Sequence, residues 1–213
     1  RDLVRITYLR LLNPQPLVKN PFTLFSDEWF VDNFDAAVLL MVRHPAAFVS
    51  SILKKGWDFP FDHWLSQDKL LNDYLSPFVP EIRPYAQTSQ ALIDQAILIW
   101  RVTHHVISKY RDSHSSWVIC RHEDISRDPL HSFVSLFEQF ELEWGKGVER
   151  FIRKSTNTEN PVDPKKALTA DIKRDSKSVI KVWRRRLNSE QILYIREATE
   201  DVACQFYDDS DWL

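Results

Sequence analysis

Residues 38–56, VLLMVRHPAAFVSSILKKG, constrain the fold of this chain more than any other stretch. They open with the apolar run 38–42, which is bounded by polar residues and is too short for a typical helix, so it predicts a strand buried on both faces. Pro45 suits the first turn of a helix, and the apolar positions after it predict a helix over residues 46–55. Arg43 therefore stands at the carboxyl end of a strand, just before a helix.

Arg43 and Ser51 lie eight residues apart in this strand–helix unit. Ligands of open α/β sheets bind at the carboxyl ends of strands, near helix N-termini. An arginine fork together with a hydroxyl group forms a plausible clamp for a phosphate dianion. Pattern alone favours a simpler alternative, in which Arg43 pairs with a carboxylate and Ser51 faces solvent, because strand–arginine–helix units are common.

The composition predicts one medium-sized domain over residues 1–213. Lys and Arg number 28 against 30 Asp and Glu, a formal net charge of −2, which argues against a general nucleic-acid or anionic-membrane binder. No apolar run approaches 18 residues, so no transmembrane helix is predicted. Cys120 and Cys204 lack a ligand spacing and are predicted to be core thiols, with neither a disulfide nor a zinc site.

The first residue and the glycines bear on what the chain can do alone. It begins with Arg1 and its only methionine is Met41, so we expect the native start and any targeting signal to lie upstream. The location of the protein therefore stays open, with a preference for the cytoplasm. The three glycines, Gly56, Gly145 and Gly147, exclude a phosphate loop of the GxxxxGK or GxGxxG type within these residues.

The remaining pattern predicts an alternation of helices with two more strands, residues 17–19 and 117–121. Helices are expected over residues 1–12, 21–33 and 88–111, after Pro129, near 147–154, and from a cap at Asn188 to about 206. Strands separated by long helical stretches predict a three-layer α/β domain with a mostly parallel sheet.

Two segments stand out from this alternation. Residues 57–86 form an excursion dense in aromatic residues and prolines, with short helices near 61–65 and 67–75. Its place at the ligand edge would suit substrate specificity, although a packed hydrophobic satellite is about as probable. Residues 155–178 are polar and predict a long mobile surface loop that ends in a cationic run.

Four segments resemble the PAPS-dependent sulfotransferase family, and together they span nearly the whole chain. LVKNPFTLFSDEWFVDNFDAAVLLMVRHPAAFVSSI looks like the family's central block, in which a strand-end lysine precedes a strand that ends in arginine. VICRHEDISRDP, SKSVIKVWRRRLNSEQ and the tail QFYDD follow in the order that the family shows. The motifs KNPF and LLMVRH are most similar to tyrosylprotein and carbohydrate-type members.

The resemblance implies a sheet of the P-loop nucleotide-binding type, lacking the first strand and the phosphosulfate loop, and it implies roles for single residues. Arg43 and Ser51 match the pair that binds the 3′-phosphate of 3′-phosphoadenylyl sulfate (PAPS), and Lys19 matches the catalytic lysine at the sulfonate. His122 stands near the expected adenine site, where stacking, hydrogen bonding or simple packing are all open. The segment matching the loop that closes on the nucleotide contains Ser176, Lys177 and Ser178.

The chain also departs from the family. The Gly-x-Pro-Arg-Ser-Gly-Thr phosphosulfate loop is missing from it, and Pro21 stands where cytosolic members carry their general base. The aromatic excursion supplies candidates for contact with the acceptor substrate, among which His63 or Asp62 could reach a hydroxyl group. The candidates for the acceptor site are Trp57, Phe61, His63 and Trp64.

These features predict a sulfotransferase that moves a sulfonate from PAPS to an acceptor hydroxyl or amine, in line and without a metal. A small molecule, a carbohydrate or a peptide would serve as acceptor, and the oligomeric state is not readable. The 213 residues alone are expected to be nearly inactive. Two alternatives stay open: a non-catalytic nucleotide- or anion-binding module, and another enzyme of the P-loop fold such as a kinase.

Overall fold

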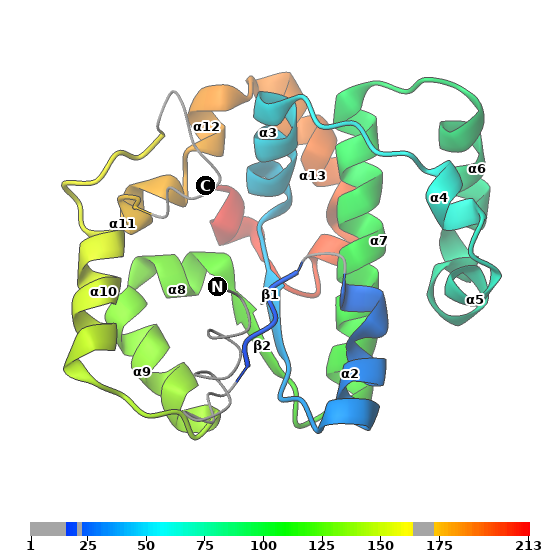
Figure 1. The fold of residues 1–213 in the computed structure, drawn as a ribbon. Coiled ribbons are helices and arrows are strands. Elements are labelled where there is room, and N and C mark those ends of the chain that lie inside the picture. Colours follow the sequence, from blue (N-terminus) through cyan, green and yellow to red (C-terminus); the bar gives the residue numbers. More distant parts are fainter. Residues whose placement is uncertain (1–15, 21–22, 164–172) are drawn as a thin grey trace, which may run out of the picture.

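The structure, a computed structural model, describes residues 16–20, 23–163 and 173–213. Helices dominate these residues, and two strands form among them. β1 (Leu39–Val42) and β2 (Val118–Arg121) are parallel neighbours, with Leu40 opposite Ile119. The strand pair lies at the centre of the molecule with helices on either side (Figure 1).

The helices differ widely in length, and the longest is α7. They are, in chain order, η1 (Thr23–Ser26), α2 (Asp27–Phe34), α3 (Pro45–Lys55), α4 (Asp62–Leu65), α5 (Asp68–Leu70), the π-helix η2 (Leu71–Leu75), η3 (Ser76–Phe78), α6 (Val79–Gln87), α7 (Leu92–Ser113), α8 (His122–Arg127), α9 (Pro129–Gln139), α10 (Lys146–Thr156), α11 (Ser176–Val179), α12 (Trp183–Arg186), α13 (Ser189–Ala203) and η4 (Asp209–Trp212). The predicted strands at 38–42 and 117–121 are confirmed. The helices expected over 88–111, after Pro129, near 147–154 and after Asn188 are confirmed as well.

The predicted three-layer α/β fold with a mostly parallel sheet of the P-loop type is wrong for the described residues. They contain a two-stranded parallel sheet, and helices form most of the rest. The third predicted strand, residues 17–19, forms no strand, and Leu17 and Val18 are 92% and 63% exposed. A short segment without a hydrogen-bonded neighbour on either side cannot hold a place in a sheet. The predicted helix over residues 1–12 lies outside the described residues.

β1 is buried on one face only, which corrects the prediction of a strand buried on both. Leu40 and Val42 are 5% and 0% exposed, whereas Leu39 and Met41 are 39% and 45% exposed. Side chains alternate between the two faces of a strand, so the second pair points away from the helices that cover the first. An apolar run shows that a strand is possible, but it does not show how many faces are covered.

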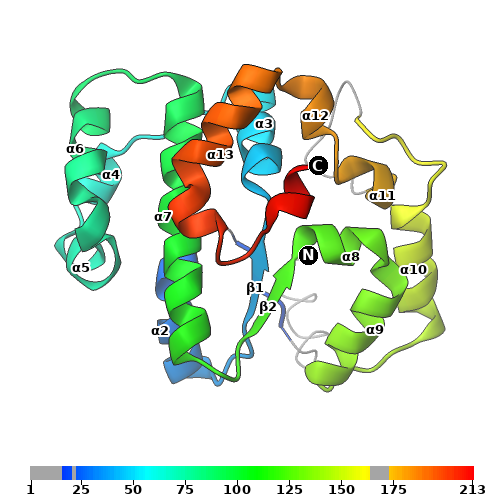
Figure 2. The ribbon, with the colours of Figure 1, turned by 180° about the vertical axis from the view of Figure 1, so that it is seen from behind.

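α7 joins the three hydrophobic clusters of the molecule. Its Trp100 packs with β1 and the end of α13, and its Ile97 packs with α3, α12 and α13. Its Leu98 and Val102 pack with the helices α4 to α6. Seen from behind, α13 crosses over α3 and α7 (Figure 2). α7 therefore positions both the strand edge and the aromatic excursion.

Local signals explain where the two helices next to the candidate site begin and end. Pro45 occupies the first turn of α3, and Gly56 ends the helix with a φ of 63°, a conformation that glycine adopts without steric cost. Asn188 caps α13 because its side chain accepts a hydrogen bond from the backbone N–H of Gln191. In turn, the side chain of Gln191 accepts one from the backbone N–H of Asn188. The capping box confirms the predicted start of the last helix.

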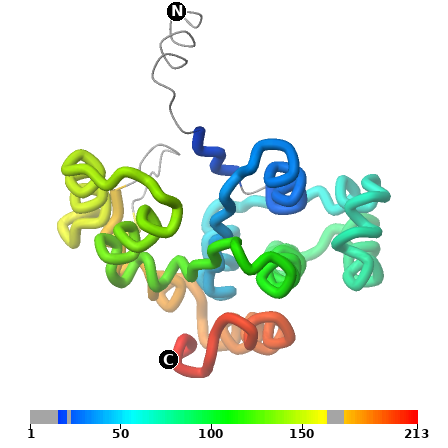
Figure 3. Tube along the Cα trace, turned by 90° about the horizontal axis from the view of Figure 1, so that it is seen from below, coloured from blue at the N-terminus to red at the C-terminus, as the bar shows by residue number. Residues whose placement is uncertain are grey.

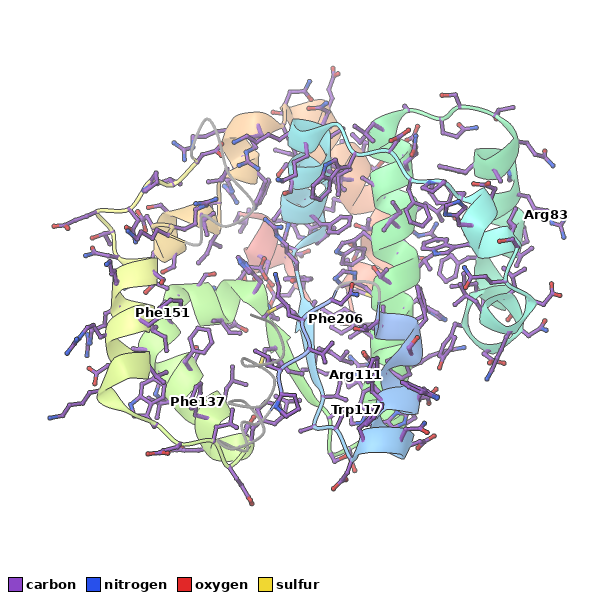
Figure 4. All side chains as sticks on the ribbon, in the orientation of Figure 1. Arg83, Arg111, Trp117, Phe137, Phe151 and Phe206 are labelled. Atoms are coloured by element: carbon purple, nitrogen blue, oxygen red, sulfur yellow. The ribbon has the colours of Figure 1, made fainter. Side chains whose placement is uncertain are left out.

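The predicted excursion, residues 57–86, is a set of short helices packed on α7; with the last residue of α6 included, residues 57–87 are here called the aromatic lobe. The short helices predicted near 61–65 and 67–75 are confirmed as α4, α5 and η2. The lobe lies on one side of α7, and α8 to α10 lie on the far side of the strands (Figures 1 and 3). Arg83 is at the outer edge of the lobe, whereas Phe137 and Phe151 belong to the α8–α10 side (Figure 4). Within the described ranges, no helix is long and apolar enough to cross a membrane.

Candidate functional site

The turn between β1 and α3, formed by Arg43 and His44, is held by side chains of α7. The indole Nε1–H of Trp100 donates to the Arg43 carbonyl at 2.8 Å, and the Arg43 N–H donates to Nε2 of His104 at 3.3 Å. Because Nε2 accepts this bond, Nδ1 of His104 carries the proton and donates to the Trp100 carbonyl at 2.9 Å. Two residues one helical turn apart thus bind both backbone polar groups of Arg43.

Glu123 holds the next backbone group of the β1–α3 turn. The His44 N–H donates to Oε1 of Glu123 at 3.0 Å, and the Tyr207 hydroxyl donates to Oε2 at 2.9 Å. Glu123 is 4% exposed, so its carboxylate is buried and accepts a bond at each oxygen. This carboxylate ties the end of β1 to the end of β2 and to the segment after α13.

The side chain of Arg43 is half-buried and has spare hydrogen-bonding capacity. Its Nε is buried and finds no partner in the described part of the chain. Burial lowers the pKa of Arg43, while the negative charge of Glu123 opposes that shift. Arg186 lies close enough to lower the pKa of Arg43 further. An arginine stays charged under these conditions. Its positive charge would therefore strongly stabilise an anion bound at this position.

His122, the first residue of α8, faces the same place. Burial lowers the pKa of His122, and the positive charge of Arg43 lowers it further. Its Nδ1 lies 4.0 Å from Oε1 of Glu123, whose charge acts in the opposite direction. The structure therefore brings His122 and Arg43 together at the carboxyl edge of the strand pair, as parallel strands require.

An aromatic box surrounds the imidazole of His44. The ring stacks on Trp183 with centroids 5.1 Å apart, and Trp212 and Tyr207 meet it edge-on at 4.3 and 5.1 Å. Burial lowers the pKa of His44 to about 3, so the ring is neutral at physiological pH. Neither ring nitrogen has a hydrogen-bond partner among the described residues.

The segment after α13 closes this box from the other side. Arg121, at the end of β2, forms an ion pair with Asp211, and its guanidinium lies 4.4 Å from the ring centroid of Tyr207. Lys181 donates to the carbonyl of Leu213 at 2.9 Å. Residues from four separate parts of the chain therefore converge on the β1–α3 turn.

The other predicted nucleotide-binding residues occupy two helices near this turn. Ser51 is half-buried on α3, two turns after Arg43. Ser176, Lys177 and Ser178 form the start of α11, which Asp175 caps by accepting from the backbone N–H of Ser178 at 3.1 Å. α11 packs against α8, the helix that carries His122.

Ser176 differs from its two neighbours on α11. Its hydroxyl is buried and donates to the carbonyl of Thr156, whereas Lys177 and Ser178 are exposed. The predicted mobile loop 155–178 begins in α10 and ends in α11, and its central part, residues 164–172, lies outside the described residues.

Lys19, the predicted catalytic residue, is exposed in the extended segment 16–20. It follows no strand, because residues 17–19 are irregular. Neither a hydrogen bond nor an ion pair joins Lys19 to another candidate residue in the described ranges. The nucleotide candidates at the strand edge are thus grouped, and Lys19 is not tied to them.

The predicted acceptor-site residues divide into two classes. Phe61 and Trp64 are 2% and 6% exposed in the core of the aromatic lobe, which favours the packed-satellite interpretation for these two. His63 and Trp57 are exposed, and the ammonium of Lys55 lies 4.7 Å from the Trp57 ring.

Sequence reasoning missed the residues that position Arg43. Neither His104 nor Glu123 stands out in the sequence as a candidate site residue. The available signals were weak: Trp100 and His104 lie four residues apart on a helix that was predicted correctly, and Tyr207 lies in the aromatic tail QFYDD. Sequence spacing does not reveal which residues on α7 and after α13 meet the end of β1.

Two open depressions on the described surface share no residue with this strand edge. One, of about 440 Å³, is lined by α10 residues that include Arg150 and Lys154. The other, of about 490 Å³, lies between α2 and the end of α7, beside Glu28 and Lys109. Neither brings together the residues that the sequence singles out.

The chain matches no protein-family model, no curated protein and no solved structure. The expectations about function therefore rest on its own residues and their geometry.

Proposed function

We propose that this chain carries the 3′-phosphate-binding part of a sulfotransferase, which transfers a sulfonate from PAPS to an acceptor hydroxyl or amine. Arg43 binds the 3′-phosphate through its guanidinium, and Ser51 adds a hydroxyl from α3, the helix that follows the turn. His122 lies beside them, where an imidazole would contact the nucleotide. The sulfotransferase-like order of the sequence segments supports this choice of nucleotide.

The observation that carries the proposal is the half-buried guanidinium of Arg43 in a rigid turn, whose buried Nε has no partner among the described residues. A buried polar group without a partner costs free energy, and a phosphate oxygen would supply the missing acceptor. Trp100 donates to this backbone, and His104 and Glu123 accept from it, so the turn is fixed before any ligand arrives. Such a preorganised cation loses little conformational freedom on binding.

The charge balance at the turn supports an anionic ligand. The negative charge of Glu123 acts on Arg43, but hydrogen bonds from His44 and Tyr207 already occupy the oxygens of Glu123. Arg186 adds a second positive charge near the guanidinium. A dianion would meet more positive than negative charge there.

In this proposal, Lys19 contacts the sulfonate and the oxygen that joins it to the leaving phosphate. During in-line transfer, charge develops on the leaving phosphate oxygen, and a positioned ammonium group stabilises it. Because Lys19 lies in an exposed segment, the binding and transfer parts of the proposal are tested separately.

The binding part is tested by titrating the 213-residue chain with adenosine 3′,5′-bisphosphate and with adenosine 5′-monophosphate in a calorimeter. The bisphosphate should bind more tightly, because only it carries a 3′-phosphate. Arg43→Ala should remove this preference, a loss of about 2–4 kcal/mol for a charge-assisted contact. Arg83→Ala, on the outer edge of the lobe, is the matched control and should change nothing. Equal affinity for both nucleotides in the unaltered chain would contradict the assignment.

The transfer part is tested with labelled PAPS and a panel of phenol, sugar and tyrosine-peptide acceptors. Activity that Lys19→Met abolishes, with bisphosphate affinity unchanged, supports a sulfotransferase. Activity that Lys19→Met leaves unchanged would contradict the role of Lys19.

A further inference from the structure

The Asp163 carboxylate bridges two cations, one on α3 and one on α12. Asp163 forms ion pairs with Lys54, on the last turn of α3, and with Arg186, at the end of α12. The contact with Arg186 is bidentate, with Nε donating to Oδ2 at 3.1 Å and an amino group donating to Oδ1 at 2.7 Å. We call these three residues the Asp163 bridge.

The Asp163 bridge lies next to the proposed phosphate site. Lys54 stands three residues after Ser51 and therefore on the same side of α3. α12 packs against α3, and the charge of Arg186 acts on Arg43. The two cations of the bridge thus belong to the same positive region as the Arg43–Ser51 pair.

The form of the bridge resembles the binding of a phosphate. A bidentate arginine–carboxylate pair uses the same fork geometry as an arginine–phosphate pair. The side chains of Lys54, Asp163 and Arg186 are 39%, 32% and 21% exposed. They are thus accessible enough to exchange partners, and a phosphate dianion carries more negative charge than the Asp163 carboxylate does.

We propose that Lys54 and Arg186 are phosphate ligands that Asp163 occupies when no nucleotide is bound, so that Asp163 acts as an internal competitor. This inference rests on the proposed function and extends it. Binding of the nucleotide breaks both contacts of Asp163, and the phosphate takes its place on Arg186 and Lys54. Removal of the carboxylate therefore strengthens binding, whereas a purely structural ion pair would weaken it or leave it unchanged.

The test compares Asp163→Asn with Asp209→Asn in calorimetric titrations with adenosine 3′,5′-bisphosphate and adenosine 5′-monophosphate. Asp209 is a matched control because it also pairs with an arginine, Arg196, and its side chain is 89% exposed. Asp163→Asn should tighten the bisphosphate about three- to fivefold, the range of a partly exposed ion pair, and leave the monophosphate unchanged. Arg186→Gln should weaken the bisphosphate about tenfold in either background.

The outcomes separate this inference from the proposed function. Tighter binding of the bisphosphate alone supports the competitor role. Unchanged or weaker binding in Asp163→Asn, with thermal unfolding confirming a folded protein, overturns that role while the phosphate site stands. If the unaltered chain shows no preference for the bisphosphate, the proposed function fails, and the inference fails with it.

Discussion

The β1–α3 turn and the aromatic lobe are stabilised in opposite ways. The turn is fixed by directional hydrogen bonds from Trp100, His104 and Glu123, which belong to distant parts of the chain. The lobe is fixed by apolar contacts, mostly among rings close in sequence, such as those of Phe61 and Trp64. The first arrangement controls position, whereas the second contributes stability. Substitutions should therefore separate the two effects.

The largest expected effect is on stability and belongs to the lobe. Phe61→Ala removes a ring that is 2% exposed and should lower the free energy of unfolding by about 3–5 kcal/mol. Urea denaturation measures this loss, and the milder Phe61→Leu serves if the alanine variant does not fold. Trp57→Ala, with 56% of the side chain exposed, should change stability by less than about 0.5 kcal/mol. A large loss of unfolding free energy in Trp57→Ala would contradict this difference between a buried and an exposed ring.

The next effect is on the pH dependence of stability and belongs to the turn. Burial lowers the pKa values of His44 and His104 to about 3, whereas both titrate near 6.5 in the unfolded chain. The unfolded state therefore binds more protons between these values, so stability is complete above pH 6.5 and falls as the pH drops. At pH 5, each histidine should lower the free energy of unfolding by about 2 kcal/mol.

Urea denaturation at pH 7 and pH 5 measures this loss, and His44→Phe isolates one half of it. The phenyl ring fits the aromatic box and sacrifices no hydrogen bond, because neither nitrogen of His44 is bonded within the described residues. The variant should be about as stable as the unaltered chain at pH 7 and less sensitive to acid. The same acid sensitivity in both proteins would contradict the neutral state of His44.

A smaller effect tests whether the bonds at Glu123 control position. Tyr207→Phe removes a hydrogen bond to a buried carboxylate and should cost about 1.5 kcal/mol in unfolding free energy. It should also weaken binding of adenosine 3′,5′-bisphosphate, because Glu123 then holds the turn less firmly. Tyr194→Phe removes an exposed bond to Asp94 and is the control, with little change expected in either measurement. Loss of stability with unchanged affinity would limit Tyr207 to a structural role.

The smallest effect concerns the pH dependence of binding. Burial and Arg43 hold the pKa of His122 below its usual value, and a bound phosphate would raise it. The affinity of the unaltered chain relative to His122→Gln should therefore increase about threefold between pH 7.5 and 6, since protonation adds a favourable charge. Comparing the two proteins cancels the ionisation of the ligand itself. If the ratio of the two affinities does not change with pH, His122 does not contribute to nucleotide binding.

Local signals predicted most of the elements but not the fold class. Pro45, Gly56 and Asn188 mark helix ends correctly, because caps and turns depend on neighbouring residues. The number of strands depends on partners elsewhere in the chain. Residues 17–19 have strand-like composition, yet Leu17 is 92% exposed and the segment pairs with no strand in the described ranges.

The candidate site was predictable to a similar degree. Arg43 and Ser51 were singled out by the strand–arginine–helix pattern, and His122 and Ser176 by the family resemblance. Glu123 could not be distinguished from an ordinary turn residue, because its partners Tyr207 and His44 are 84 and 79 residues away. Contacts of this kind appear only when the chain is folded.

The long span between β1 and β2 has a consequence for how the protein acquires its structure. Leu40 pairs with Ile119, and α3, the lobe and α7 lie between them in the sequence. The two strands can therefore pair only after a large loop has closed. Closing such a loop costs conformational entropy before the contact contributes, whereas the lobe can form from nearby residues. The β1–α3 turn should therefore be among the last regions to gain protection from amide hydrogen exchange during refolding. Arg43 would reach its final geometry only when both halves of the chain are already in place.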